Sequence, residues 1–123
     1  MAEVKRTYYV SGELLSEVFV INDKMNGEYK EYYDDGQLDT ICSYIDDKKN
    51  GEYKSYHSNG QLWMLCSYID GKINSECKSY HENGQLWEIY NCTNDKMNGE
   101  YKRYDMNGEL VEICVYENRQ KIQ

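Results

Sequence analysis

Alternating polar and apolar residues recur along this chain with a period of 24 residues. The pattern is clearest in Asn50–Ile69, which reads NGEYKSYHSNGQLWMLCSYI. Its Asn-Gly-Glu-Tyr-Lys start also occurs at Asn26 and Asn98, and in altered form at Asn74. Five units follow one another without insertions, which predicts a repeat protein whose units pack on their neighbours.

A turn residue, a glycine and a leucine form a second signature with the same period. The glycines are Gly12, Gly36, Gly60, Gly84 and Gly108, and the leucines are Leu14, Leu38, Leu62, Leu86 and Leu110. We place the units at about 1–21, 22–45, 46–69, 70–93 and 94–117, with a polar tail at 118–123. Met1–Arg6 is interpreted as a leader into the first unit. Residues 1–123 are therefore expected to form a single repeat domain.

Each unit is predicted to contain a short strand, a turn, a longer strand and a second turn. In the third unit, Asn59-Gly60 favours a two-residue hairpin turn with positive φ at both positions. Tyr53–His57 and Gln61–Ile69 are the flanking strands. Asp70-Gly71 leads into the next unit, as do Asn22-Asp23, Asp46-Asp47 and Asn94-Asp95 in theirs. No segment predicts a helix, so the expected fold is all-β, a twisted antiparallel meander of about ten strands.

A two-residue turn also fixes which side chains share a face of the sheet. Tyr56 would oppose Trp63, and His57 would oppose Leu62. One face is then expected to carry Tyr53, His57, Leu62, Met64, Cys66 and Tyr68, and the other Lys54, Tyr56, Trp63, Leu65 and Ile69. A bulge at the turn would change this assignment. Stacking of units aligns Tyr8, Tyr32, Tyr56, Tyr80 and Tyr104 in one row.

Composition narrows the function classes. The net charge of −8 and pI of about 4.7 argue against binding to nucleic acid, which needs a basic face. No apolar run approaches the roughly 18 residues of a membrane span, and no signal peptide is apparent. We therefore expect a cytoplasmic protein. Aromatic residues, mostly tyrosine, are expected to supply the burial that sparse aliphatic residues do not.

The five cysteines are interpreted as small buried thiols within strands. Cys42, Cys66 and Cys114 hold equivalent positions in three units. Their odd number and the absence of paired spacing disfavour a zinc site or a disulfide framework. In the fourth unit, Ser75 and Cys77 replace the expected glycine and tyrosine. In the same unit, Cys92 stands where the other units have tyrosine, and Tyr90 stands where they have cysteine. This exchange predicts local repacking between neighbouring rows.

Catalytic chemistry is not indicated. His57 and His81 are equivalent residues of adjacent units, about 10 Å apart in the expected sheet, which is too far to share a metal ion. Each is interpreted as a half-exposed strand residue. Catalytic sites are singular, whereas every notable residue here has copies in other units. We therefore predict no enzyme activity, no metal and no cofactor.

Two rows of lysines raise the alternative of a lipid-binding surface. Lys30, Lys54, Lys78 and Lys102 align with Arg6, and Lys24, Lys48, Lys72 and Lys96 form the second row. Each lysine of the first row follows a glutamate by two residues, on the same side of its strand. Ion pairing that keeps the sheet soluble is the favoured interpretation.

Aromatic residues are the candidate binding residues. Trp63 and Trp87 occupy equivalent positions, where the other units have Leu15, Asp39 and Val111. Packing within the sheet is favoured for both, and the alternative is a protein-binding patch. The candidate binding set is Tyr32, Tyr56, Trp63, Tyr80, Trp87 and Tyr104.

The pattern Asn-Gly-Glu-Tyr-Lys-x-Tyr-x-x-Asn-Gly-Gln-Leu, followed by Tyr-Ile-Asp-Gly-Lys, resembles the MORN repeat in its variant of about 24 residues. The resemblance extends from about Thr7 to Glu117. Such repeats occur in bacterial proteins labelled as antitoxins and in long arrays of giant DNA viruses. The resemblance implies an elongated, single-layer sheet of stacked hairpins with non-enzymatic roles in scaffolding, dimerisation and anionic lipid binding.

The predicted function is therefore a protein-interaction or scaffold module, with a protein partner or a homodimer. The alternatives are a peripheral membrane adaptor and an antitoxin that masks a toxin surface. Both edges of an open meander expose unpaired backbone groups that favour association. The predicted edges are the strand near Arg6–Tyr9 and the strand Leu110–Glu117.

Overall fold

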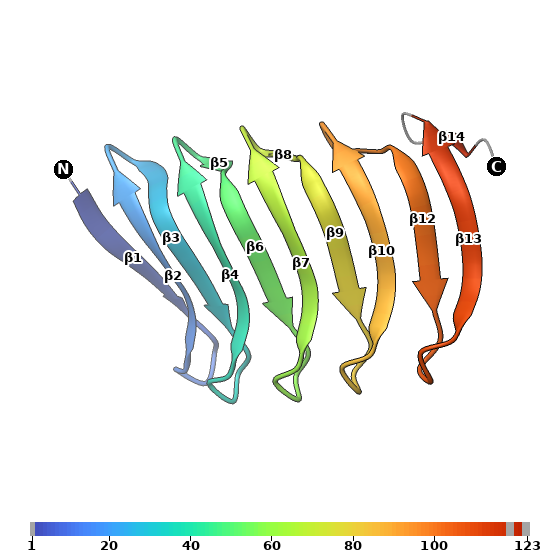
Figure 1. Cartoon of the computed structure of the whole chain (residues 1–123). Coiled ribbons are helices and arrows are strands. Elements are labelled where there is room, and N and C mark those ends of the chain that lie inside the picture. The colour runs from blue at the N-terminus through green and yellow to red at the C-terminus, as the bar shows by residue number, and fades with distance from the viewer. Residues whose placement is uncertain (1, 118–119, 122–123) are drawn as a thin grey trace.

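The computed structural model describes residues 2–117 and 120–121, which form one open antiparallel sheet (Figure 1). The strands are β1 (Ala2–Tyr8), β2 (Leu14–Ile21), β3 (Lys24–Tyr32), β4 (Leu38–Ile45), β5 (Lys48–Lys49), β6 (Gly51–Tyr56), β7 (Leu62–Ile69), β8 (Lys72–Ile73), β9 (Ser75–Tyr80), β10 (Leu86–Thr93), β11 (Lys96–Met97), β12 (Gly99–Tyr104), β13 (Leu110–Glu117) and β14 (Gln120–Lys121). No helix occurs in these residues, so the all-β prediction is confirmed.

Strands follow one another across the sheet in chain order, and β1 and β14 lie at its opposite ends (Figure 1). The short strands β5, β8 and β11 lead into β6, β9 and β12 after a one-residue break at Asn50, Asn74 and Asn98. Each such pair acts as one long strand with a kink. The expected ten-strand meander is therefore present, and the two-residue strand β14 is added at its C-terminal edge.

The hairpin turn within each unit differs from the predicted two-residue form. In the third unit, the amide of Gly60 donates to the carbonyl of His57, and the amide of His57 donates to the carbonyl of Gln61. Only Gly60 has positive φ, at 89°, and Asn59 does not. The loop is thus Ser58–Gly60, a β-turn followed by a residue in the left-handed region. The same hydrogen bonds occur in all five units.

The turns between units match their prediction. Asp46 and Asp47 both have positive φ, at 48° and 69°, as a two-residue turn of this hand requires. Asn22-Asp23, Asp70-Gly71 and Asn94-Asp95 have the same geometry. Asp47 also ties neighbouring strands together, since its amide donates to the carbonyl of Met25 and its Oδ1 accepts from the Met25 amide at 2.7 Å.

A bulge at the start of each long strand corrects the predicted faces. The register Tyr53–Cys66 and Lys54–Leu65 is as expected, but Tyr56 pairs with Leu62 rather than Trp63. Trp63 is therefore the extra residue of the bulge. It lies on the face of Cys66 with His57, while Leu62 lies on the face of Lys54 with Tyr56. The alternation could not show this, because residues 62–66 are all apolar.

One face, here called the cysteine face, carries the small core of the protein. Cys42, Cys66, Cys77, Cys92 and Cys114 are all buried and free of disulfides, as predicted. Cys66, Cys77 and Cys92 cluster together under half-buried aromatic and aliphatic side chains, which include Tyr53 and Tyr68. A hydrogen bond with Cys66 and burial raise the pKa of the Cys77 thiol, so that it stays protonated.

The fourth unit keeps the regular register despite its altered sequence. Tyr53 pairs with Cys66 in the third unit, and Cys77 pairs with Tyr90 in the fourth. The large and the small side chain have therefore exchanged strands, so the local volume is conserved. Ser75 replaces a glycine, and its hydroxyl accepts a hydrogen bond from the Ser67 amide at 2.8 Å. The exchange of Tyr90 and Cys92 along β10 therefore leaves the register unchanged, and the predicted repacking between rows stays a prediction.

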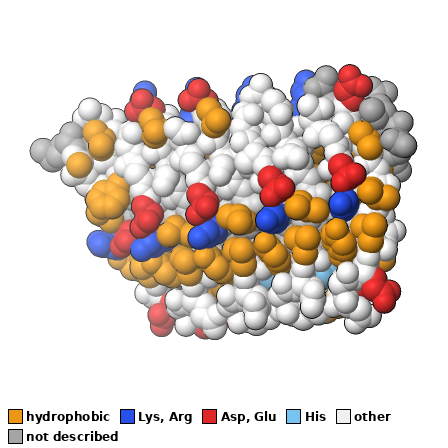
Figure 2. All heavy atoms as spheres, in the orientation of Figure 1, with side chains coloured by type: hydrophobic (Ala, Val, Ile, Leu, Met, Phe, Trp, Pro, Cys, Tyr) orange, Lys and Arg blue, Asp and Glu red, His pale blue; other side chains and the backbone are white. Residues whose placement is uncertain are grey.

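The opposite face, here called the lysine face, carries Lys30, Lys54, Lys78 and Lys102. Each ammonium lies 3.2–3.5 Å from the carboxylate of the glutamate two residues earlier. Figure 2 shows these alternating charges above a continuous band of apolar side chains. Leu38, Ile41 and Tyr56 line a hollow together with Glu28, Glu52 and Lys54. The predicted ion pairing of the first lysine row is confirmed.

The edges of the sheet differ in part from their prediction. β1 begins at Ala2 and pairs with β2 along its length, so the described part of the expected leader belongs to the sheet. At the other end, β14 pairs Lys121 with Tyr116 and Gln120 with Glu117, so it covers one end of the expected edge strand. The other residues of the predicted polar tail, 118–119 and 122–123, lie outside the described residues.

Six tyrosines of the cysteine face predict a loss of stability in alkali. Burial is the largest cause that raises the pKa of each, and that of Tyr68 rises to about 12. They are Tyr29, Tyr44, Tyr53, Tyr68, Tyr90 and Tyr101. Because the folded state holds these phenols neutral, the stability they contribute is complete below about pH 10 and declines as the pH rises through the folded pKa values.

Absorbance at 295 nm measures this titration directly. We expect some of the tyrosines of the native protein to ionise only above about pH 11, together with unfolding, whereas all ionise near pH 10 in urea. A native titration that superimposes on the titration in urea would contradict the predicted burial.

Candidate functional site

A side chain at the end of each short strand bridges to the next unit. His57 crosses the start of β7, and its Nε2 lies 2.7 Å from the carbonyl oxygen of Tyr80. His81 repeats this contact with Tyr104 at 2.8 Å. Since a carbonyl only accepts, Nε2 carries the proton in both rings. Tyr9 and Tyr33 hold the same position in the first two units, and their hydroxyls donate to the carbonyls of Tyr32 and Tyr56.

The bulge explains why this bridge is needed. Pairing between β7 and β9 joins Leu65 with Lys78 and Met64 with Ser79, and the bulge at Trp63 follows. One residue further along β9, the carbonyl of Tyr80 accepts from His57. A side chain thus continues the ladder where the backbone of the neighbouring strand is displaced. Asn59 adds a second link between units, because its side-chain Nδ2 donates a hydrogen bond to the backbone carbonyl of Glu82 at 2.8 Å.

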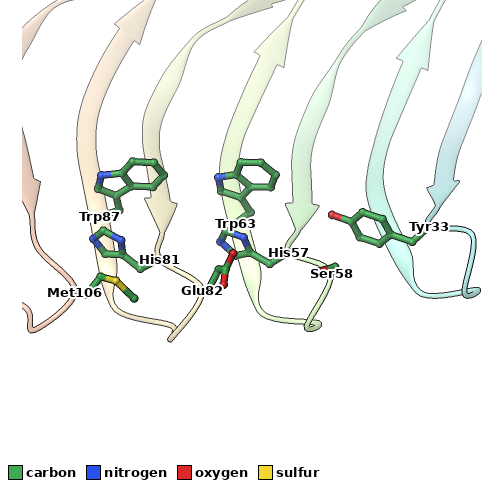
Figure 3. A pocket seen from close by; sticks show the side chains of 8 residues that line it. All are labelled: Tyr33, His57, Ser58, Trp63, His81, Glu82, Trp87 and Met106. Atoms are coloured by element: carbon green, nitrogen blue, oxygen red, sulfur yellow. The ribbon is translucent and has the colours of Figure 1, made fainter.

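Two tryptophans lie against these bridging histidines. The ring centres of His57 and Trp63 are 4.7 Å apart, with an angle of 14° between the rings. His81 and Trp87 stack in the same way at 5.1 Å and 24°. Figure 3 shows the two stacks side by side in the same orientation. Trp63 remains 41% exposed, so the stack fixes the indole without burying it.

The stacks line a groove on the cysteine face with a volume of about 590 Å³. We call this the Trp–His groove and define it by its lining residues, Tyr33, His57, Ser58, Trp63, His81, Glu82, Trp87 and Met106. These residues come from four consecutive units (Figure 3). Among the described residues, neither indole N–H of this groove donates a hydrogen bond.

The structure separates the six predicted binding residues. Trp63 and Trp87 line the groove, whereas Tyr56 lies on the lysine face with Lys54 and Leu38. The alternation along the strands places Tyr32, Tyr80 and Tyr104 on the lysine face as well. The four tyrosines therefore do not share a site with the tryptophans. Their backbone carbonyls, rather than their rings, contribute by accepting the bridging hydrogen bonds.

Sequence reasoning missed the role of Tyr33, His57 and His81 in the groove. The signal for it was present, because the position that they share with Tyr9 always holds a ring with a hydrogen-bond donor in the first four units. A bridge over 23 residues becomes visible only when the bulge is known. Both histidines are half-buried, which agrees with their interpretation as partly exposed residues.

Carboxylates gather at the N-terminal end of the groove. Burial is the first cause that raises the pKa of Tyr33, followed by the charges of Asp39, Asp35 and Glu31. Burial also raises the pKa of Asp39, which holds the position of Trp63 in the preceding unit. Glu82 adds a carboxylate to the lining. The Trp–His groove is thus aromatic along its length, with Glu82 in its lining and three further carboxylates near Tyr33 at its N-terminal end.

The groove has the chemistry of a binding surface. Nε2 of each histidine is engaged with a carbonyl, and no group of three His, Cys, Asp or Glu side chains suited to a metal ion occurs among the described residues. Nor do those residues contain a long apolar helix able to cross a membrane. Stacked rings, partly exposed indoles and a carboxylate in the lining favour recognition of an extended ligand.

Comparison with known proteins identifies a repeat family. A family model described as the MORN repeat variant matches residues 25–46, 49–70, 71–93 and 97–118. A search of curated proteins finds no match. Among solved structures, the crystal structure of TarM is 14% identical over 76% of this chain, with a TM-score of 0.46. This chain spans 18% of the length of that one, and at this level of similarity no function follows.

Replacing His57 tests whether the bridge holds the units together. His57→Ala removes the hydrogen bond to Tyr80 and the ring that stacks on Trp63. We expect the free energy of unfolding in urea to fall by about 1–3 kcal/mol. His57→Tyr is the matched control, because Tyr33 makes the same bridge in the preceding unit, and we expect it to change stability by less than about 0.5 kcal/mol. Equal losses in both variants would contradict the bridging role.

Proposed function

Because the chain belongs to the MORN repeat variant family, whose members are generally interaction or membrane-binding modules, we propose that it binds a protein partner through the Trp–His groove. The observation that supports this proposal is the pair of stacked, partly exposed tryptophans on one face of the sheet. Tryptophan is enriched among the residues that dominate protein–protein binding energy. Rings that are already held in place lose little conformational entropy on binding.

A non-enzymatic role forms part of this proposal. MORN repeats are generally non-enzymatic, and the groove repeats one structural motif in two adjacent units. Cytoplasmic location is likewise proposed, since five buried free thiols suit a reducing compartment. An antitoxin-like role, in which the partner is a toxin, stays a prediction of the family resemblance.

The alternative of a peripheral membrane adaptor has weaker support. The first lysine row is paired with glutamates along the whole lysine face. The second row, Lys24, Lys48, Lys72 and Lys96, lies at the turns between units, which also hold five aspartates. Neither row presents a net positive surface. With a net charge of −8, the chain is repelled by anionic membranes.

Vesicle flotation tests the membrane alternative. We expect no flotation of the chain with vesicles that contain phosphoinositides at physiological salt, because the lysines are neutralised by neighbouring acids. Neutral vesicles are the matched control. Micromolar binding to the anionic vesicles that is lost in Lys54→Ala/Lys78→Ala would overturn this expectation.

Affinity capture from the native cell tests the proposed protein-binding role. The bait is compared with Trp63→Leu/Trp87→Leu, which should fold because Leu15 holds the same position in the first unit. We expect the double variant to retain at least about tenfold less of a specific partner. Each retained protein is then purified and its direct binding to the chain measured by calorimetry.

Lys54→Ala/Lys78→Ala on the lysine face is the matched control and should retain the partner. If this control loses the partner and the tryptophan variant retains it fully, the contact lies on the lysine face, which would contradict our proposal. Light scattering over a roughly hundredfold concentration range distinguishes a second copy of the chain from a different partner.

A further inference from the structure

The bulge residues of successive units form one row on the cysteine face. These residues are Leu15, Asp39, Trp63, Trp87 and Val111. Each is the extra residue left without a cross-strand partner within its hairpin. An acid, an indole and a second indole therefore follow one another along this row, from Asp39, which lies one unit before the first tryptophan of the Trp–His groove, to Trp87.

The spacing of this row is set by the sheet. Asp39, Trp63 and Trp87 lie on β4, β7 and β10, and each neighbouring pair is separated by one intervening strand. Two strand spacings amount to about 9.6 Å. A polyproline II helix rises about 3.1 Å per residue and has three residues per turn, so every third side chain returns to the same side after about 9.3 Å. The two periods agree to within a few tenths of an ångström.

Hydrogen-bond donors in the groove have the same period. Figure 3 shows both indole nitrogens on the ring edge that faces the C-terminal units. The indole N–H groups are thus parallel donors separated by one unit. A polyproline II chain makes no internal hydrogen bonds and keeps its carbonyls exposed, so it presents acceptors at matching intervals.

The charges near the groove are a third feature that a ligand must match, after the spacing of the row and the indole donors. Asp39 lies one unit before Trp63. Asp35 and Glu31 lie close enough to Tyr33 for their charges to raise the pKa of its hydroxyl, after burial as the larger cause. Glu82 lies within the groove lining itself. A basic side chain three residues from the proline that packs on Trp63 would meet this acidic end. Electrostatic complementarity of this kind selects among ligands with the same apolar residues.

We propose that the Trp–His groove binds a polyproline II peptide that places prolines, three residues apart, on Trp63 and Trp87 and an Arg or Lys, three residues further, at Asp39. This inference rests on the proposed protein-binding function and specifies its ligand. Proline-rich segments dock in aromatic grooves at low entropic cost, because their free conformation already matches the bound one.

A second copy of this chain does not meet these requirements, since the sequence contains no proline. A neutral glycan would match the aromatic spacing but would gain nothing from the charge of Asp39, Asp35 and Glu31. The favoured ligand is therefore a basic, proline-rich segment of another protein.

Fluorescence provides the test, because Trp63 and Trp87 are the only tryptophans of the chain and both line the groove. The probes are two dodecapeptides that contain neither tryptophan nor tyrosine. One carries the order Arg-x-x-Pro-x-x-Pro and the other the reverse order, Pro-x-x-Pro-x-x-Arg. We expect saturable changes in emission with at least one of them. Replacing both prolines of that peptide by alanine should weaken binding at least about tenfold.

Variants of the chain assign the roles. Trp63→Leu and Trp87→Leu, each followed through the remaining tryptophan, should weaken binding at least about tenfold. Asp39→Asn should weaken it about two- to fivefold and reduce its salt dependence. Circular dichroism confirms that each variant is folded, and Lys54→Ala is the control that leaves the peptide affinity unchanged.

Two results would overturn the inference. One is no saturable binding of either peptide up to about 1 mM, which corresponds to negligible affinity. The other is binding of a neutral cello-oligosaccharide in place of the peptides, unaffected by Asp39→Asn. If the peptides fail while capture of a native partner still depends on Trp63 and Trp87, only the ligand class is wrong. If capture is also independent of them, the proposed function fails as well.

Discussion

The hydrogen bond from the end of one unit to the backbone of the next is the interaction on which this architecture depends. A bulge at the start of each long strand displaces the backbone from the regular ladder, next to carbonyls such as that of Tyr80. In four successive units, a tyrosine or histidine ring crosses the displaced strand and donates a hydrogen bond to such a carbonyl. Because a single-layer sheet has little core, links between units are needed to keep the array rigid.

The same constraint produces the candidate site. The bridging side chain lies over the bulged strand, and the bulge turns its extra residue toward that side chain. Where the bridge is His57 or His81, the extra residue is tryptophan and the two rings stack. Where the bridge is Tyr33, the extra residue is Asp39. A regular array thus acquires a groove with an aromatic centre and an acidic end through changes at two positions per unit.

Much of the fold could be predicted from local signals, since the period, the strands and the turns between units each depend on residues close in sequence. The bulge could not, because Leu62 to Cys66 are all apolar and fit either face. Asn59-Gly60 also suggested the wrong loop, as only Gly60 takes positive φ while Asn59 bonds to the next unit. The two tryptophans were therefore recognised as candidates but placed on the opposite face, with tyrosines that do not share their site.

Nuclear magnetic resonance of the two indole N–H groups reports directly on binding in the Trp–His groove, because each tryptophan gives one indole N–H signal and both residues line the groove. When the protein partner or a proline-rich peptide binds, we expect both indole signals to shift together. The backbone amides of Lys30, Lys54, Lys78 and Lys102 on the lysine face should shift far less. Shifts confined to the lysine face, with both indole signals unchanged at saturation, would contradict the account.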